Sequence, residues 1–168
     1  MRNSKAIYIT KAAITAALYV VLTLFTGAFS FASGPIQIRL SEALTVLPFF
    51  MPESVLGLFV GCLLSNLFTG CLPWDIIFGS AATLIGAIGT YYLGKTRISV
   101  KYKKWLAPLP PIISNTLIIP YILIKVYNLK GTYPYFMLTI GISEFLSAGI
   151  IGMIFLLSLE RYINRRLH

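Results

Sequence analysis

The sequence predicts an all-α membrane protein, a bundle of six transmembrane helices with both termini in the cytoplasm. Hydrophobic residues make up 57% of the chain and charged residues 11%, and the mean hydropathy is +0.82. A soluble domain carries roughly 25% charged residues. Because apolar stretches recur along the whole sequence, residues 1–168 are expected to form a single integral membrane domain.

Six apolar stretches of helical character predict the six helices, and a perpendicular span needs about 20 residues. They cover residues 7–26, 40–50, 53–69, 74–93, 106–127 and 134–163. The second is only half the required length, so it is tilted, partial, or extended backward through Pro35. Pro48 and Pro52 require a tight junction with the third helix. The first stretch is expected to be a retained span and not a cleaved signal.

The distribution of basic residues sets the expected orientation. With six spans, eleven of the 14 Lys and Arg residues fall on one side, and only Arg39, Lys125 and Lys130 fall on the other. Because loops rich in Lys and Arg stay in the cytoplasm, both termini are placed there. The net charge of +9 is therefore attributed to orientation, and no nucleic acid partner is expected.

Carboxylates are rare enough in this chain to carry information. An ionisable group within a span costs about 2.5–3.5 kcal/mol on insertion scales, so it persists where it pairs, lines a cavity or binds a ligand. The predicted topology brings polar residues to the outer ends of several helices, where they form a pocket open to the exterior. The candidates are Arg39, Glu42, Asn66, Trp74, Asp75 and, about nine residues into the sixth helix, Glu144.

Local structure offers an alternative explanation for two of these carboxylates. Glu42 follows Arg39 by three residues and so has the spacing of a helical salt bridge. Asp75 is an acidic residue in the first turn of a helix, which the helix dipole favours. Glu144 has no cation within a turn and is the strongest ligand candidate. Glu53 and Glu160 are expected to be solvated at the cytoplasmic boundary.

Small residues spaced four apart predict close helix packing. Two glycine-containing stripes, Gly57-xxx-Gly61-xxx-Ser65 and Gly79, Thr83, Gly86, Thr90, are assigned to packing inside the bundle. The first helix carries Ala12-xxx-Ala16 and Ala13-xxx-Ala17, which serve either internal packing or docking of another subunit.

Motifs of known enzyme classes are missing from the sequence. It has no HExxH, G-x-S-x-G or Walker A motif, and its one histidine is His168. We therefore expect no enzyme activity, no cofactor and no metal site. A membrane-embedded enzyme using paired carboxylates is the less favoured alternative.

Three stretches of the sequence form a recognisable pattern: QIRLSEALTVLPFF at 37–50, GLFVGCLLSNL at 57–67 and DIIFGSAATL at 75–84. They resemble the QueT family, whose members are substrate-binding S components of energy-coupling factor (ECF) transporters. The resemblance implies a six-helix S component that binds a vitamin-like substrate at the outer face. It further implies a transmembrane coupling subunit and two cytoplasmic ATPases as partners, and docking through Ala12 and Ala16 or Ala13 and Ala17. The implied location is the cell membrane of a Gram-positive prokaryote.

The substrate class that the resemblance implies is the queuosine precursors, which are 7-deazaguanine bases or queuine. A carboxylate can accept the N–H and amino group of a guanine-like edge, and its carbonyl needs a donor. Glu42, Asp75 or Glu144 offers the carboxylate, and Trp74 or a tyrosine offers a stacking surface. The candidate donors are Asn66, Asn115, Gln37 and Arg39. An S component for thiamine, folate or biotin is the alternative within the same architecture.

Overall fold

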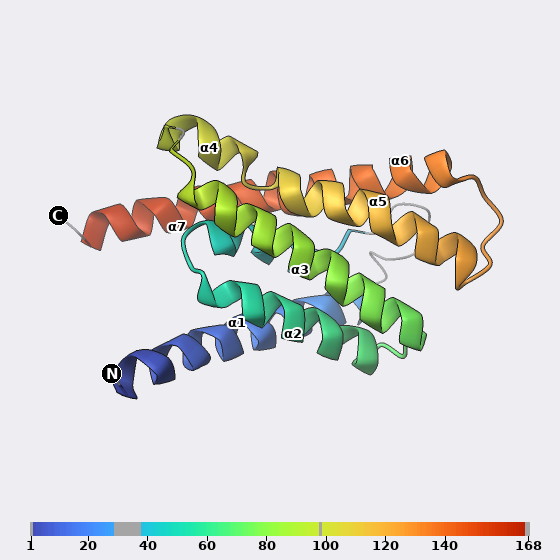
Figure 1. The fold of residues 1–168 in the computed structure, drawn as a ribbon, viewed down its shortest axis with the longest axis horizontal. Coiled ribbons are helices and arrows are strands. Elements are labelled where there is room, and N and C mark those ends of the chain that lie inside the picture. The colour runs from blue at the N-terminus through green and yellow to red at the C-terminus, as the bar shows by residue number, and fades with distance from the viewer. Residues whose placement is uncertain (1, 29–37, 98, 167–168) are drawn as a thin grey trace.

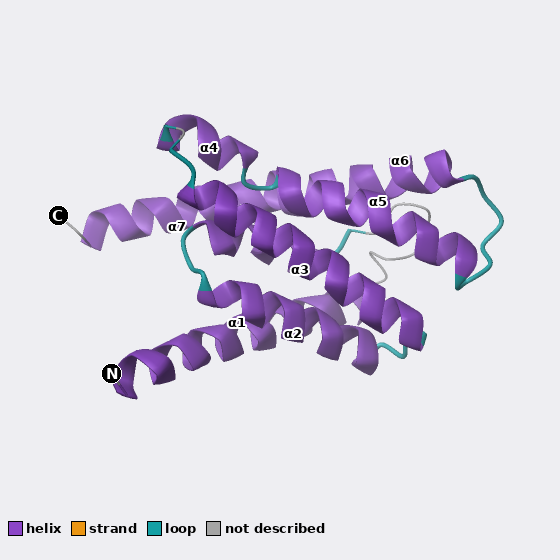
Figure 2. Cartoon of the chain, viewed as in Figure 1, coloured by secondary structure: helices purple, strands orange, loops and turns teal. Residues whose placement is uncertain are grey.

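The computed structural model describes residues 2–28, 38–97 and 99–166, and this part of the chain contains helices and no strands (Figures 1 and 2). The elements are α1 Arg2–Ala28, η1 Leu40–Phe49, α2 Glu53–Phe68, α3 Pro73–Lys95, α4 Val100–Leu106, α5 Leu109–Lys125, α6 Tyr133–Glu144, η2 Phe145–Ile151 and α7 Gly152–Arg166. Each of the six predicted helices corresponds to one of these elements or to a continuous series of them. The all-helical prediction is confirmed for the described residues.

Four helical stretches are long and apolar enough to cross a membrane, namely Ser4–Ala28, Pro73–Lys95, Tyr102–Lys125 and Tyr133–Tyr162. The helices η1 and α2 are apolar but shorter. Large hydrophobic side chains also cover the outside of the bundle, as at Ile9, Val21, Leu138 and Ile154, each more than 60% exposed. An apolar exterior of this kind suits lipid and not water, so the fold is that of a multi-pass membrane protein.

The short second helix, η1, is a 3₁₀ helix of ten residues. Runs of more than three or four residues are uncommon in this conformation, and at about 2.0 Å per residue η1 extends roughly 20 Å. Its interior residue Pro48 has no N–H to donate. Residues 41–48 are all buried, and η1 contacts α1, α2, α3, η2 and α7. It is therefore a central element, while the suggested extension through Pro35 lies outside the described residues.

The small-residue stripes pack helices together, as predicted for the glycine-containing pair. A Cβ at Gly57 would lie 2.5 Å from the carbonyl oxygen of Ala12, and one at Gly61 would lie 3.1 Å from the Cα of Ala16. Likewise, a Cβ at Gly86 of α3 would lie 2.6 Å from the Cα of Pro111 on α5. At these positions the glycines allow the helix backbones to approach closely.

The alanines of α1 fall on two different faces. Ala12 and Ala16 are 5% and 7% exposed because α2 covers them. Ala13 and Ala17 are exposed. The face that packs internally is therefore Ala12 and Ala16, and only Ala13 and Ala17 stay accessible for the docking suggested from the sequence.

The start of α1 and the end of α7 lie at the same end of the bundle, together with α4 (Figure 1). The links from α2 to α3 and from α5 to α6 lie at the opposite end. The basic segment around α4 thus accompanies the termini, as an even number of spans requires. Two ion pairs of 3.0 Å, Lys11–Glu53 and Lys104–Glu160, involve the two glutamates that were expected to be solvated.

The last helix is continuous from α6 through η2 to α7, and η2 is π-helical. Glu144 is the last residue of α6, directly before this wider segment. π-Helical turns inside α-helices occur frequently at functional sites. The helix thus changes its geometry next to the carboxylate that the sequence singles out.

Candidate functional site

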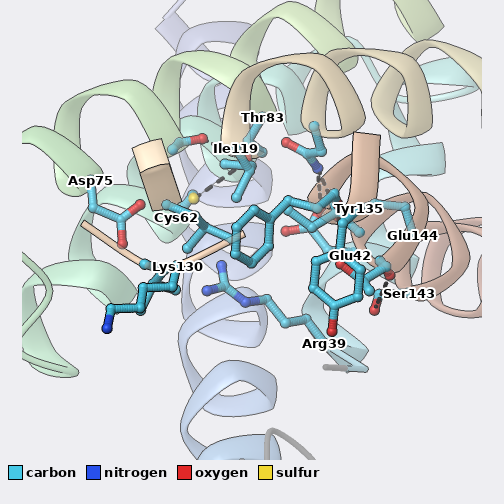
Figure 3. Close-up of a pocket in the computed structure, with 17 residues that line it drawn as sticks. Arg39, Glu42, Cys62, Asp75, Thr83, Ile119, Lys130, Tyr135, Ser143 and Glu144 are labelled. Atoms are coloured by element: carbon cyan, nitrogen blue, oxygen red, sulfur yellow. Dashed lines mark hydrogen bonds between the residues drawn. The ribbon is translucent and has the colours of Figure 1, made fainter. Parts of the chain in front are cut away.

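A cavity of about 370 Å³ lies between η1, α2, α3, α5 and α6 (Figure 3). Its lining includes Leu129 and Lys130 of the link between α5 and α6, and that link lies at the end of the bundle opposite the start of α1 (Figure 1). This volume lies near the lower end of the range for ligand pockets. The polar part of its wall consists of Arg39, Glu42, Cys62, Asp75, Thr83, Asn115, Lys130, Tyr135, Thr139, Ser143 and Glu144. The apolar part includes Ile119, Leu123, Leu129, Phe136 and Ile140.

Two carboxylates meet at the buried end of this cavity. Glu42 of η1 and Glu144 of α6 are 2% and 8% exposed, and Asn115 of α5 lies between them at 3%. The Nδ2 of Asn115 donates to Glu144 Oε1 at 3.0 Å and, more weakly, to Glu42 Oε2 at 3.4 Å. The hydroxyl of Tyr19 on α1 donates to the other oxygen of Glu42. Three helices and η1 therefore converge on one pair of acids.

One oxygen of this pair is unsatisfied. Glu144 Oε2 is buried and has no hydrogen-bond partner among the described residues. A buried carboxylate oxygen without a donor is costly, and such groups in native structures call for an explanation. Because Glu144 lines the cavity, a ligand that donates a hydrogen bond would remove this deficit.

Arg39 supplies a cation to the same cavity. It precedes η1 in an extended conformation, and its guanidinium is directed into the pocket (Figure 3). Among the described residues the ion pairs within 4.0 Å are the two at the terminal end of the bundle, so Arg39 does not form the predicted local bridge to Glu42. Within the described part of the chain, its guanidinium has no ion-pair partner within 4.0 Å, and it can therefore donate to a ligand.

Asp75 occupies the outer part of the cavity, in the first turn of α3. It accepts a hydrogen bond of 2.8 Å from the hydroxyl of Tyr127, which itself accepts one from the Leu72 N–H at 3.3 Å. Burial, together with the hydrogen bond to Asp75, raises the pKa of Tyr127 to about 12. The tyrosine therefore remains a donor at physiological pH, and its bond links the start of α3 to the segment after α5.

Comparison with known proteins identifies the family. The model of the QueT transporter family matches residues 9–161. The chain belongs to this family. The queuosine precursor transporter QueT of Lactococcus lactis subsp. cremoris (strain MG1363) is 40% identical over 86 residues, which is 51% of this chain and 50% of the relative. The match thus spans about half the length of that relative, and no solved structure matches.

Five of the eight binding residues proposed from the sequence line the cavity of this QueT-family member, namely Arg39, Glu42, Asp75, Asn115 and Glu144. Asn66 is buried behind the wall, with its Nδ2 3.7 Å from the Sγ of Cys62. Trp74 is 58% exposed, stacks on Phe78 at 6.0 Å and does not line the cavity. Gln37 lies outside the described residues.

Several contributors were not among the predicted site residues. Tyr19 is fully buried against Glu42, and its three-residue spacing from Ala16 places it on the packed face of α1. Tyr135 and Lys130 come from the start of α6 and the preceding link, and both are exposed at the mouth (Figure 3). Cys62 and Thr83 form part of the wall, joined by a hydrogen bond of 3.3 Å. The described residues include no cluster of three His, Cys, Asp or Glu that could hold a metal.

Proposed function

We propose that this protein is the substrate-binding S component of an ECF-type importer and captures a queuosine precursor, a 7-deazaguanine base or queuine, from outside the cell. Membership of the QueT transporter family supports transport, and the name of the Lactococcus relative supports the substrate class. The observation that carries the proposal is the unsatisfied Glu144 Oε2 in a polar cavity of suitable size. The protein binds its substrate and performs no catalysis.

The groups in the cavity match the hydrogen-bonding pattern of a guanine-like base. Its N–H and amino groups are donors that a carboxylate accepts side by side, and its carbonyl is an acceptor for a guanidinium. The pocket offers both kinds of group, with carboxylate acceptors at Glu144 and Asp75 and guanidinium donors at Arg39, and Glu144 Oε2 is the acceptor without a partner among the described residues. The apolar wall and Tyr135 supply surface for the ring.

The proposed topology has six spans, with both termini in the cytoplasm and the cavity open to the exterior. The excess of Lys and Arg at the terminal end of the bundle supports this orientation. The partners are a transmembrane coupling subunit and two cytoplasmic ATPases, which supply the energy for uptake. Of the four alanines proposed for docking, Ala13 and Ala17 are the exposed pair available to the coupling subunit.

Calorimetric titration of the purified full-length protein in nanodiscs tests the proposal. The aminomethyl and cyano forms of 7-deazaguanine and queuine are the candidate ligands, and thiamine, folate and biotin are the competitors. We expect at least one deazaguanine to bind and the three vitamins not to displace it. Saturation by a vitamin with no deazaguanine binding would refute the substrate assignment.

A pair of matched variants tests the site itself. Glu144→Gln keeps the shape of the side chain and removes its charge, and it should weaken binding of at least one of the deazaguanines by roughly tenfold or more. Glu160→Gln makes the same change at the terminal end of the bundle, where Glu160 pairs with Lys104. It should leave affinity unchanged, and equal effects of the two variants would disprove the location of the site.

A further inference from the structure

The buried end of the cavity has an unbalanced charge. Glu42 and Glu144 both lie within hydrogen-bond distance of one Asn115 nitrogen, so two carboxylates share one neutral donor. Among the described residues, the cation that interacts electrostatically with both acids is Arg39. Tyr19 and Cys62 also face this end and are neutral as hydroxyl and thiol. With both acids ionised, this end of the pocket carries one negative charge in excess.

The outer part of the cavity does not correct this imbalance. Lys130 is exposed on the link before α6, and Asp75, which is nearer the solvent than the buried pair, contributes a further negative charge. Charges near solvent are screened far more strongly than buried ones. A cationic group that enters the pocket would compensate the charge of the buried pair, which without such a group is neutralised by taking up a proton.

We propose that the site selects a cationic ligand, and that Glu144 is the residue that determines this selectivity. The inference rests on the proposed function and deepens it. Among 7-deazaguanines, the aminomethyl form carries an ammonium group, and the cyano form has the same ring without a charge. An ammonium has three donors, and Glu144 Oε2 is a buried acceptor without a donor.

This placement also gives the two ends of the pocket different roles in binding the ligand. An ammonium between Glu42 and Glu144 leaves Asp75 as the carboxylate for the N–H and amino edge of the ring. The guanidinium of Arg39 is directed into the space between and is the donor for the ring carbonyl (Figure 3). The two carboxylate regions should consequently respond differently to mutation.

The test compares the affinities of the aminomethyl and cyano bases for the full-length protein in nanodiscs. The native protein should bind the aminomethyl base at least about tenfold more tightly. Glu144→Gln should reduce this preference by about tenfold or more while binding of the cyano base is retained or improved. Asp75→Asn is the matched control, which should weaken both ligands and leave their ratio within about threefold.

Each outcome has a distinct meaning. Equal affinities, or tighter binding of the cyano base to the native protein, would overturn the inference and leave the proposed function standing. An unchanged ratio in Glu144→Gln, with a normal melting curve, would overturn the role of Glu144. If that variant does not fold, Glu42→Gln provides the same comparison from the other member of the pair. Failure of every deazaguanine to bind would overturn both the proposed function and the inference.

Discussion

Replacing Asn115 with alanine should destabilise the ligand-free protein by about 2 kcal/mol. The amide is the one described donor to Glu144, at 3.0 Å, and one of two donors to Glu42. A hydrogen bond to a charged group contributes about 1.5–3 kcal/mol. The second bond, at 3.4 Å, is near the limit of useful geometry and adds little. Most of the loss should therefore come from Glu144.

A double-mutant cycle isolates that contribution. Unfolding of the ligand-free protein in mixed micelles should be compared for Asn115→Ala, Glu144→Leu and the two changes together. Once Glu144 is absent, the loss of Asn115 should cost less than half as much, which corresponds to a coupling of roughly 1 kcal/mol or more. Asn115→Ala should also weaken ligand binding, because Glu42 and Glu144 lose the hydrogen-bond donor that they share.

Asn66 provides the matched control for this prediction. It is also a buried asparagine, but its Nδ2 is 3.7 Å from the sulfur of Cys62, a weak acceptor. Asn66→Ala should therefore cost under about 1 kcal/mol. The reasoning is refuted if both alanine variants cost the same, or if the effects of Asn115→Ala and Glu144→Leu simply add.

Two further predictions concern helix packing and the outer part of the cavity. Gly57→Ala should lower the free energy of unfolding by about 1–3 kcal/mol, because the new Cβ overlaps α1. Gly27→Ala is the control, because a Cβ at that position meets open space. Equal melting temperatures of the two variants would contradict the close approach of α1 and α2. The raised pKa of Tyr127 means that its bond to Asp75 contributes fully below about pH 10, the ordinary value for tyrosine, and is lost as the pH rises through about 12. Tyr127→Phe should remove this alkaline dependence from the unfolding curve, and an identical pH profile in the variant would show that the bond contributes nothing.

The rarity of charge in the sequence was sufficient to predict most of the cavity. In a chain this apolar, an ionisable side chain inside a helix has few stable surroundings, so Glu42 and Glu144 could be assigned to one pocket across 102 positions of sequence. Asn115 could be included as a donor, although its position between the two acids depends on how α5 packs. That packing is a property of the assembled bundle.

Residues at helix ends were harder to place. Trp74 and Asp75 are adjacent, so they point about 100° apart on α3 and only one of them can face the cavity. Tryptophan and aspartate are both common at the membrane interface, so the sequence does not show which of the two faces the cavity. The packing of α3 places Asp75 there and leaves Trp74 exposed. The 3₁₀ conformation of η1 could not be predicted from the sequence either, since the same apolar residues are compatible with an α-helix. It depends on the contacts that surround η1 on all sides.

The π-helical segment η2 has a consequence for the two halves of the helix that contains it. In an uninterrupted α-helix, the buried face of α6 that includes Phe136 and Ser143 would continue through Ile150 and Ile154. Those two isoleucines are instead 45% and 62% exposed, and Leu156 is buried. The wider turns thus rotate α7 relative to α6, so that Glu144 can face the ligand cavity while the next half of the same helix packs on η1. A single-residue deletion within η2 would force these two faces into one register, and either the acid or the core contact would be turned toward lipid.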